Sequence, residues 1–221
     1  MLPTIDRCLR VAAVLAAVGF ASLASAGPPL ICHPFVTGAD DALLPWAEGR
    51  SWRLPDPAYD VAGLVADTLE LLAADAPILA RMENMRRATI YAERDPQVAA
   101  ALLRAVVERT ATTPADARAE AIEWFDAGYL IETYRQLGLV YEHEMLPGKE
   151  RWVSLVPADL ASLDGYALVQ KALERAPEAR AELEFASSLL SHAPIADAHR
   201  RRAAAAAAPG SLIAQNLAAF D

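Results

Sequence analysis

Apolar side chains recur every three to four positions along most of the chain after residue 56, which is the spacing of an amphipathic helix. One stripe contains Val61, Leu64, Val65, Thr68, Leu69 and Leu72, and another contains Val98, Leu102, Leu103, Val106 and Val107. The pattern predicts helices near 57–73, 76–93, 96–110, 114–126, 128–144, 158–175, 177–192, 195–208 and 210–220. The best strand candidate, 151–156, is too short and isolated to build a sheet. We therefore expect an all-α fold of antiparallel helical hairpins.

Three of these helices are predicted to begin at a capping residue followed by proline. The pairs are Asp56-Pro57, Asp95-Pro96 and Thr113-Pro114. The capping oxygen accepts a hydrogen bond from an amide of the first turn, and proline has no amide that would be left unpaired there. Each pair is thus interpreted as a helix start.

Residues 27–55 have no helical periodicity and are interrupted by prolines at positions 28, 29, 34, 45 and 55. Proline neither continues a helix nor donates to a strand ladder, so we expect an extended arm. Its apolar and aromatic residues, Trp46 among them, predict that the arm lies on the rest of the protein. The chain is therefore divided into residues 1–26, an arm over 27–55 and a single helical domain over 56–221.

Residues 1–26 have the order of a secretory signal peptide. Arg7 and Arg10 precede the apolar run 11–23, and Ala24-Ser25-Ala26 is a small-residue cleavage site. The apolar run is shorter than the roughly 20 residues that a membrane span needs. We expect cleavage after Ala26 and a periplasmic or secreted protein.

Cleavage changes both the charge and the cysteine content. The whole chain has 20 basic and 29 acidic residues, and loss of Asp6, Arg7 and Arg10 leaves 18 and 28, a net charge of −10. An acidic surface is repelled by nucleic acids and anionic lipids, so we expect neither partner, and no membrane association of the mature form. Cys8 leaves with the signal, and Cys32 remains as the one cysteine, unable to form an internal disulfide.

Two glycine–tyrosine pairs, Gly128-Tyr129 and Gly165-Tyr166, are separated by close to the roughly 34-residue period of tetratricopeptide repeats. Gly165, Val169, Ala172 and Pro177 also match the spacing of the second helix of such a repeat, although an aromatic residue is usual where Val169 stands. The chain thus weakly resembles the tetratricopeptide family over about one and a half units. Two architectures stay open: a short tetratricopeptide-like solenoid and an irregular helical bundle.

Three further segments carry a second resemblance. They are the post-signal arm Gly-Pro-Pro-Leu-Ile-Cys-His at 27–33, Arg-Met-Glu-Asn-Met-Arg-Arg-Ala at 81–88 and Trp-Phe-Asp-Ala-Gly-Tyr at 124–129. They make the chain similar to an uncharacterised group of exported bacterial helical proteins. The resemblance implies export and a common helical fold, and it transfers no site.

Cys32 and His33 are the first candidates for chemistry. Adjacent thiolate and imidazole groups could ligate a metal, but structural zinc normally takes four ligands and no spacing supplies the others. The segment also resembles a c-type haem attachment sequence in which Pro29 replaces the first cysteine. A third alternative is a reactive thiol that forms a disulfide with another molecule. We expect instead a cysteine packed under the arm, where it acts as a small apolar residue, and we expect no cofactor.

The acidic and aromatic residues between Glu123 and Glu132 are the second candidates. Trp124, Asp126 and Tyr129 combine an aromatic ring, a carboxylate and a phenol, as many carbohydrate clefts do. Core aromatics alternating with surface acids give the same string without any function. Glu142-His143-Glu144 is interpreted as a solvated helix end, because neighbouring side chains diverge on a helix.

The arginine-rich segment around Glu83 leaves two interpretations open. Arg81, Arg86 and Arg87 could receive a carboxylate or phosphate ligand, while pairing of Glu83 with Arg86 or Arg87 within one helix explains them equally well. The run 200–202, three arginines, is interpreted as a solvated helix segment.

The sequence contains no phosphate-binding glycine loop, nucleophile elbow, zinc-protease motif or CxxC pair. We therefore expect a protein- or peptide-binding module without catalytic activity. The alternative is a periplasmic enzyme or a metal- or haem-binding protein that uses Cys32-His33 or the Glu123–Glu132 region.

Overall fold

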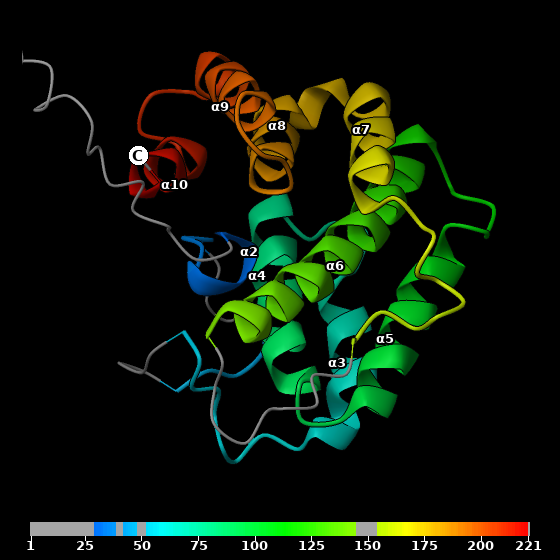
Figure 1. The fold of residues 1–221 in the computed structure, drawn as a ribbon. Helices are drawn as coiled ribbons and strands as arrows, with labels where there is room; N and C mark the ends of the chain where they lie inside the picture. The colour runs from blue at the N-terminus through cyan, green and yellow to red at the C-terminus, as the bar shows by residue number, and fades with distance from the viewer. Residues whose placement is uncertain (1–28, 39–41, 48–51, 145–153, 221) are drawn as a thin grey trace, which may run out of the picture.

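The fold is all-α throughout the described residues, as predicted (Figure 1). The computed structural model describes residues 29–38, 42–47, 52–144 and 154–220, and for Pro29 and 141–144 the backbone only. The helices are α2 (Pro29–Cys32), α3 (Leu64–Leu71), α4 (Ile78–Ala92), α5 (Pro96–Arg109), α6 (Ala117–Glu144), α7 (Gly165–Arg175), α8 (Arg180–Leu189), α9 (Ile195–Ala206) and α10 (Leu212–Ala219). Short 3₁₀ turns, η2 (Val61–Gly63) and η3 (Pro177–Ala179), lead into α3 and α8.

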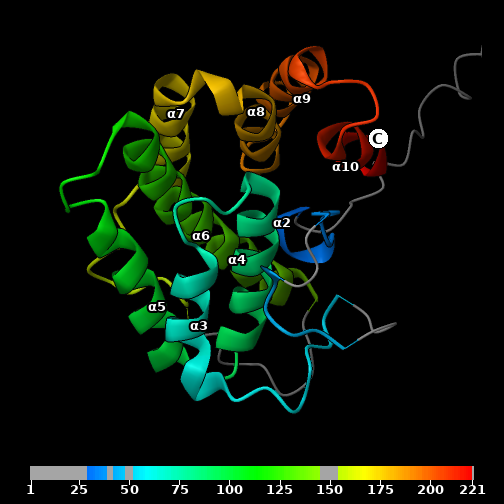
Figure 2. The ribbon, with the colours of Figure 1, turned by 180° about the vertical axis from the view of Figure 1, so that it is seen from behind.

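Helix α6 is the centre of the arrangement. It runs diagonally across the molecule, with α3, α4 and α5 on one side and α7 to α10 on the other (Figures 1 and 2). Its interior face buries Phe125, Leu130 and Ile131 completely, and these side chains belong to one continuous apolar core. The molecule is therefore an irregular bundle built around a single long helix.

Only one of the three capping-residue–proline pairs begins a helix. Asp95 accepts hydrogen bonds from the amides of Gln97 and Val98 and starts α5 as predicted. In the other two cases the helix begins three or four residues after the proline. The turn η2 follows Asp60, and α6 follows Asp116. Asp60 and Asp116 each accept from an amide two or three residues on, so a nearby aspartate replaced the predicted cap in both cases.

The prediction of two helices over 114–126 and 128–144 was wrong, because α6 passes through Gly128 without a break. The reason is a close crossing with α7. A Cβ atom on Gly165 would lie 2.5 Å from the carbonyl oxygen of Gly128, and one on Gly128 would press on the backbone of Gly165. Glycine is needed at both positions because no side chain fits between the two backbones.

This crossing also accounts for the repeated glycine–tyrosine pair. Gly128 and Gly165 face each other across one helix contact, whereas equivalent residues of two stacked repeats would occupy the same position in successive units.

The other predicted helices agree in type, with shorter ends: α7 begins at Gly165 rather than near 158, and α8 ends at Leu189. Of the strand candidate, residues 151–153 lie outside the described residues, and 154–156 form no strand.

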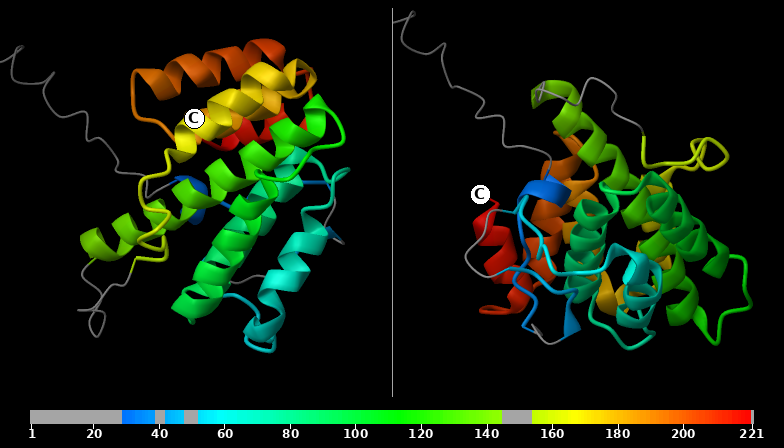
Figure 3. Two further views of the ribbon diagram at one scale, coloured as in Figure 1. Left: turned by 90° about the vertical axis from the view of Figure 1, so that its right-hand side faces the viewer. Right: turned by 90° about the horizontal axis from the view of Figure 1, so that it is seen from below.

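The arm lies on the bundle, and its apolar residues are part of the core. Leu30, Ile31 and Leu44 have no exposed surface, and the arm contains the short helix α2 where an extended chain was expected. The arm runs beside α10, as Figure 3 shows from below. Asn216 of α10 holds the arm there, because its side chain both accepts from the amide of Val36 (3.0 Å) and donates to its carbonyl (2.9 Å).

Candidate functional site

The Cys32-His33 pair packs against the last helix. The His33 ring lies 4.9 Å from the ring of Phe220, and burial lowers the pKa of His33 below its usual value. Cys32 ends α2 and is half-buried. Among the described residues, no three cysteine, histidine, aspartate or glutamate side chains are grouped closely enough to hold a metal ion. The observed contacts of His33 are therefore those of an aromatic packing residue.

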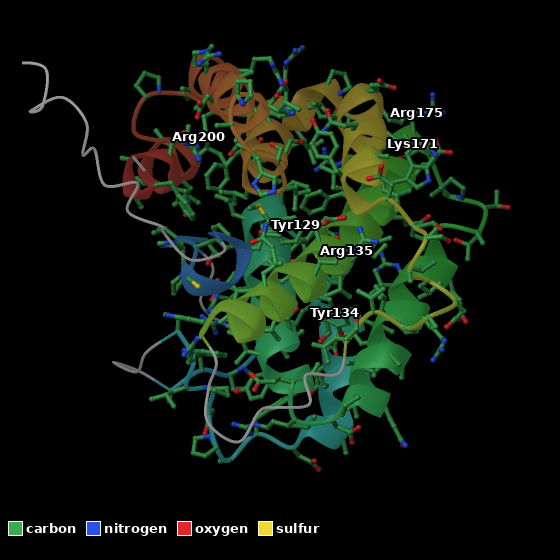
Figure 4. All side chains as sticks on the ribbon, viewed as in Figure 1. Tyr129, Tyr134, Arg135, Lys171, Arg175 and Arg200 are labelled. Carbon is green, nitrogen blue, oxygen red and sulfur yellow. The ribbon has the colours of Figure 1, made fainter. Side chains whose placement is uncertain are left out.

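The acidic and aromatic candidates of α6 point in different directions. Asp126 and Tyr129 are completely buried, whereas Trp124 is half-buried, with the Lys171 ammonium 5.8 Å from its ring centroid. Figure 4 shows Tyr129 and Tyr134 on α6 and Lys171 and Arg175 along α7. The structure thus does not bring Trp124, Asp126 and Tyr129 together in one open cleft.

Asp126 is paired with arginines inside the bundle. Its Oδ2 atom lies 2.7 Å from Nη1 of Arg81, which is also fully buried, and 3.5 Å from Nη1 of Arg109. Burial raises the pKa of Asp126 to about 6, and the two arginines oppose that rise. Arg81 also donates to the carbonyl oxygens of Leu72 and Ala73 at the end of α3, so this pair connects α3, α4 and α6.

The arginine-rich segment of α4 is a structural cluster, which we call the Glu83 cluster (Glu83, Asn84, Arg86 and Arg87). Glu83 is 1% exposed and accepts two hydrogen bonds from Arg86, at 2.8 and 2.7 Å, and one from Arg87 at 2.7 Å. Burial acts to raise the pKa of Glu83, but the two guanidinium groups outweigh it and hold the pKa below the usual value. The interpretation as pairing within one helix is confirmed.

The same cluster binds the arm. Glu83 accepts from the amide of Phe35 at 3.1 Å, and Asn84 accepts from the amide of Leu44 at 2.8 Å. Arg87 donates to the carbonyl of Leu44, and both Arg86 and Arg87 lie over the ring of Trp46. The polar groups that could have received a ligand are thus already occupied by the chain itself.

A cavity of about 580 Å³ opens where four helix ends meet. It is lined by the first turns of α4, α8 and α10 and by the last turn of α9: residues 77–79, 180–182, 206–208 and 211–213, with Thr37, Pro177 and Glu178. Most of these side chains are apolar, and three are charged. Its size is within the range of pockets that hold small molecules or single peptide side chains.

The charged groups of the cavity differ in their pairing. Glu178 forms an ion pair with Arg118 at 2.9 Å, and Arg180 lies 3.6 Å from Glu184. Glu182 is half-buried and forms no ion pair with any described residue. Glu182 is therefore the carboxylate that can pair with a bound group.

A second polar arrangement connects α7, α8 and α9, and we call it the Glu184 relay (Glu184, His199 and Tyr166). The carboxylate Oε2 of Glu184 lies 2.6 Å from Nδ1 of His199, and Nε2 of His199 lies 2.7 Å from the hydroxyl of Tyr166. Glu184 and His199 are buried, whereas Tyr166 is half-exposed. The relay leads from the interior of the bundle to its surface.

Neither the cavity nor the Glu184 relay leaves a local signal in the sequence. The cavity is formed by helix ends far apart in the chain, and Glu184 and His199 are 15 residues apart on separate helices, so neither site forms a motif.

Two further sequence interpretations concern charged helix segments. Arg202 donates to both oxygens of Glu184 at 2.8 Å, which corrects the interpretation of 200–202 as a wholly solvated segment. For Glu142-His143-Glu144, the side chains lie outside the described residues.

Comparison with protein-family models, curated protein sequences and solved structures finds no match for this chain. No helix of the described part is long and apolar enough to span a bilayer. These comparisons give no support to the tetratricopeptide alternative. The features of the structure that bear on function are the cavity and the Glu184 relay.

Proposed function

We propose that the protein is an exported helical module that binds a peptide segment of a partner protein. The single observation that carries this proposal is the cavity of about 580 Å³ between α4, α8, α9 and α10. The signal-peptide pattern of residues 1–26 supports export. The arm supports a preformed site, because Thr37 lines the cavity and the preceding residue, Val36, is bonded to α10.

The lining favours an apolar group. Ile78, Leu79, Leu212 and Ile213 line the cavity from two helices, and a run of alanines at 206–208 also lines it. Small alanine side chains leave space that a larger apolar side chain of a ligand fills. Burial of such a side chain contributes roughly 1.5–3 kcal/mol.

The charges favour a basic residue beside that apolar group. Glu182 is available for pairing, while Arg180 is near Glu184 and Glu178 is bound to Arg118. The mature chain is expected to carry a net charge of −10, which steers basic segments toward it. The proposed ligand is thus a short segment in which a basic residue adjoins a large apolar one.

A titration with two labelled peptides tests the proposal. The probes are fluorescein-labelled octapeptides that are identical except for one central position, with leucine–lysine in one and leucine–glutamate in the other. Fluorescence anisotropy with the chain from Gly27 onward should show saturable binding of the lysine peptide and at least tenfold weaker binding of the glutamate peptide.

Two variants with matched controls locate the binding. Ala207→Trp fills the cavity and should abolish binding, whereas Ala101→Trp on the exposed face of α5 should not. Glu182→Gln should weaken the lysine peptide roughly threefold to fivefold, the loss expected for one partly exposed ion pair, and Glu108→Gln should leave it unchanged. Equal affinity of both peptides, or unchanged binding by Ala207→Trp, would contradict the proposal.

A further inference from the structure

The imidazole of His199 contacts three polar groups of the bundle. Its Nδ1 atom lies 2.6 Å from Glu184 Oε2, which can only accept, and 2.6 Å from Nη2 of Arg202, which can only donate, so these two contacts favour opposite tautomers. In the tautomer with the proton on Nδ1, directed to Glu184, the lone pair of Nε2 accepts from the hydroxyl of Tyr166 at 2.7 Å. This is the order of groups in a nucleophile–histidine–carboxylate triad, with a phenol as the nucleophile.

We propose that Tyr166 is a nucleophile that accepts the acyl group of a small ester, with His199 as general base and Glu184 as the residue that positions His199. In the first step the Tyr166 oxygen attacks the ester carbonyl while its proton passes to Nε2 of His199. The bond between the carbonyl carbon and the leaving oxygen then breaks, and His199 returns the proton to that oxygen. Water hydrolyses the acyl-tyrosine by the same route, so the sum is ester plus water giving acid plus alcohol.

The surrounding charges require a general base rather than a preformed phenolate. Burial raises the pKa of Tyr166, Glu184 and Asp164 raise it further, and the positive charge of Arg202 lowers it. The phenol is therefore neutral at rest and reacts only as its proton is removed.

The geometry of the relay is rigid at its buried end. Glu184 is 1% exposed and receives Nε of Arg202 on both oxygens, so its carboxylate cannot rotate away from His199. The Tyr166 and His199 rings meet edge to face at 5.9 Å between centroids. Preorganised groups of this kind lose little entropy when a reactant arrives.

Other tyrosines provide an internal comparison. Tyr59 donates to the carboxylate of Asp67 at 2.6 Å, and Tyr134 donates to the carbonyl of Ala99 at 3.1 Å. Among the tyrosines whose side chains the structure describes, only Tyr166 is bonded to an imidazole. Tyr59 is also half-exposed, but burial and its hydrogen bond to Asp67 raise its pKa well above the usual value, so it reacts more slowly than a free phenol.

The experiment uses p-nitrophenyl acetate as the probe and the chain from Gly27 onward. Release of p-nitrophenolate should show a burst equal to one equivalent of protein, and peptide mapping by mass spectrometry should place the acetyl group on Tyr166. Acetylation of Tyr166 in the unmutated chain should be more than tenfold faster than acetylation of free N-acetyltyrosinamide, a phenol without a general base, in the same solution. That comparison needs no variant, so it decides the question even where a substitution unfolds the protein.

Three variants then separate the roles. Tyr166→Phe should abolish the burst, while Tyr59→Phe should leave it unchanged. His199→Gln should slow acetylation about a hundredfold, the usual contribution of a general base. Glu184→Gln should slow acetylation about tenfold at saturating ester while leaving the half-saturating ester concentration unchanged, because Glu184 positions His199 and does not touch the ester.

Acetyl groups spread evenly over Tyr59, Tyr166 and the lysines would overturn the proposal, as would an unchanged burst in His199→Gln. An unchanged acetylation rate at saturating ester in Glu184→Gln would overturn the positioning role of that residue. The reaction is independent of the peptide cavity, since Ala207→Trp should block peptide binding and leave the burst intact. Failure of one proposal is therefore distinguishable from failure of the other.

Discussion

Two buried glutamates, Glu83 on α4 and Glu184 on α8, have similar surroundings and different connections. Each is 1% exposed and each is held by an arginine within 2.8 Å. All the partners of Glu83 are guanidinium groups and a backbone amide. Glu184 instead continues through an imidazole to a half-exposed phenol.

The difference shows how to separate a structural polar cluster from a chemical one. In the Glu83 cluster every described contact ends on the chain itself, and the group it fixes is the arm. In the Glu184 relay the last atom is the hydroxyl of the half-exposed Tyr166, hydrogen-bonded to Nε2 of the His199 imidazole. Burial and ion pairing are thus common to both, and the identity of the terminal group distinguishes them.

The largest expected effect comes from breaking the Glu83 cluster. Glu83→Gln leaves the buried Arg86 without its opposite charge and weakens the bond to the amide of Phe35. Loss of one partner of a buried ion pair costs about 3–5 kcal/mol, so the free energy of unfolding should fall by that amount. Urea denaturation followed by circular dichroism measures it.

Glu178→Gln is the control for that variant, since it removes an exposed ion pair with Arg118 and should cost less than about 1 kcal/mol. Equal losses in the two variants would show that the Glu83 cluster does not hold the fold together.

The next effect is a pH dependence on the α4 side of the molecule. Asp126 has a pKa of about 6 in the folded protein against 3.8 in the reference state. Between these values the folded state binds a proton that the unfolded state lacks, so stability due to Asp126 rises as pH falls from 6 toward 4. The gain is roughly 3 kcal/mol at most.

The measurement is the difference in unfolding free energy between the unmutated chain and Asp126→Asn from pH 7 to pH 4. The subtraction cancels the contributions of the other carboxylates to the pH dependence of the unfolding free energy. Glu83 is one of them, and its lowered pKa makes the protein less stable as pH falls, which is opposite to the effect of Asp126. A difference that stays flat over this range would mean that Asp126 is ionised throughout.

A smaller effect is expected at the crossing that connects the two regions. Gly128→Ala places a Cβ atom against the backbone of Gly165 and within 2.9 Å of the Cβ of Leu168. Helix α7 must then shift away from α6, at a cost of about 1–3 kcal/mol. Because Tyr166 follows Gly165 directly, the shift should also slow acetylation of Tyr166.

Leu139→Ala, at a position of the same helix that is 41% exposed, is the control, because it removes no buried side chain. It should change the free energy of unfolding by less than about 0.5 kcal/mol. Slower acetylation in Gly128→Ala than in Leu139→Ala would connect the crossing to the relay.

Helix type and order could be predicted from the apolar spacing, because a face buried against one neighbour leaves a periodic signal. Helix α5 is such a case, with Leu102, Leu103 and Val106 buried and its start at Asp95. Continuity of α6 could not be predicted, since glycine lowers helix propensity and only the approach of Gly165 explains Gly128.

The candidate sites were less predictable for a different reason. Charged residues on α4 suggest a solvated face, but the arm covers Glu83 and Arg86, and α3 and α6 enclose Arg81. Such long-range coverage leaves no local pattern. His199 and Glu184 likewise meet only because α8 and α9 pack side by side, so the relay required the structure.

The most direct test of this account measures acetylation of Tyr166 by p-nitrophenyl acetate in Glu83→Gln and Glu184→Gln side by side, under conditions in which both remain folded. The account predicts an unchanged rate in Glu83→Gln, despite its lower stability, and a rate about tenfold lower in Glu184→Gln. Equal rates in the two variants would contradict the claim that one buried glutamate holds the fold and the other supports chemistry.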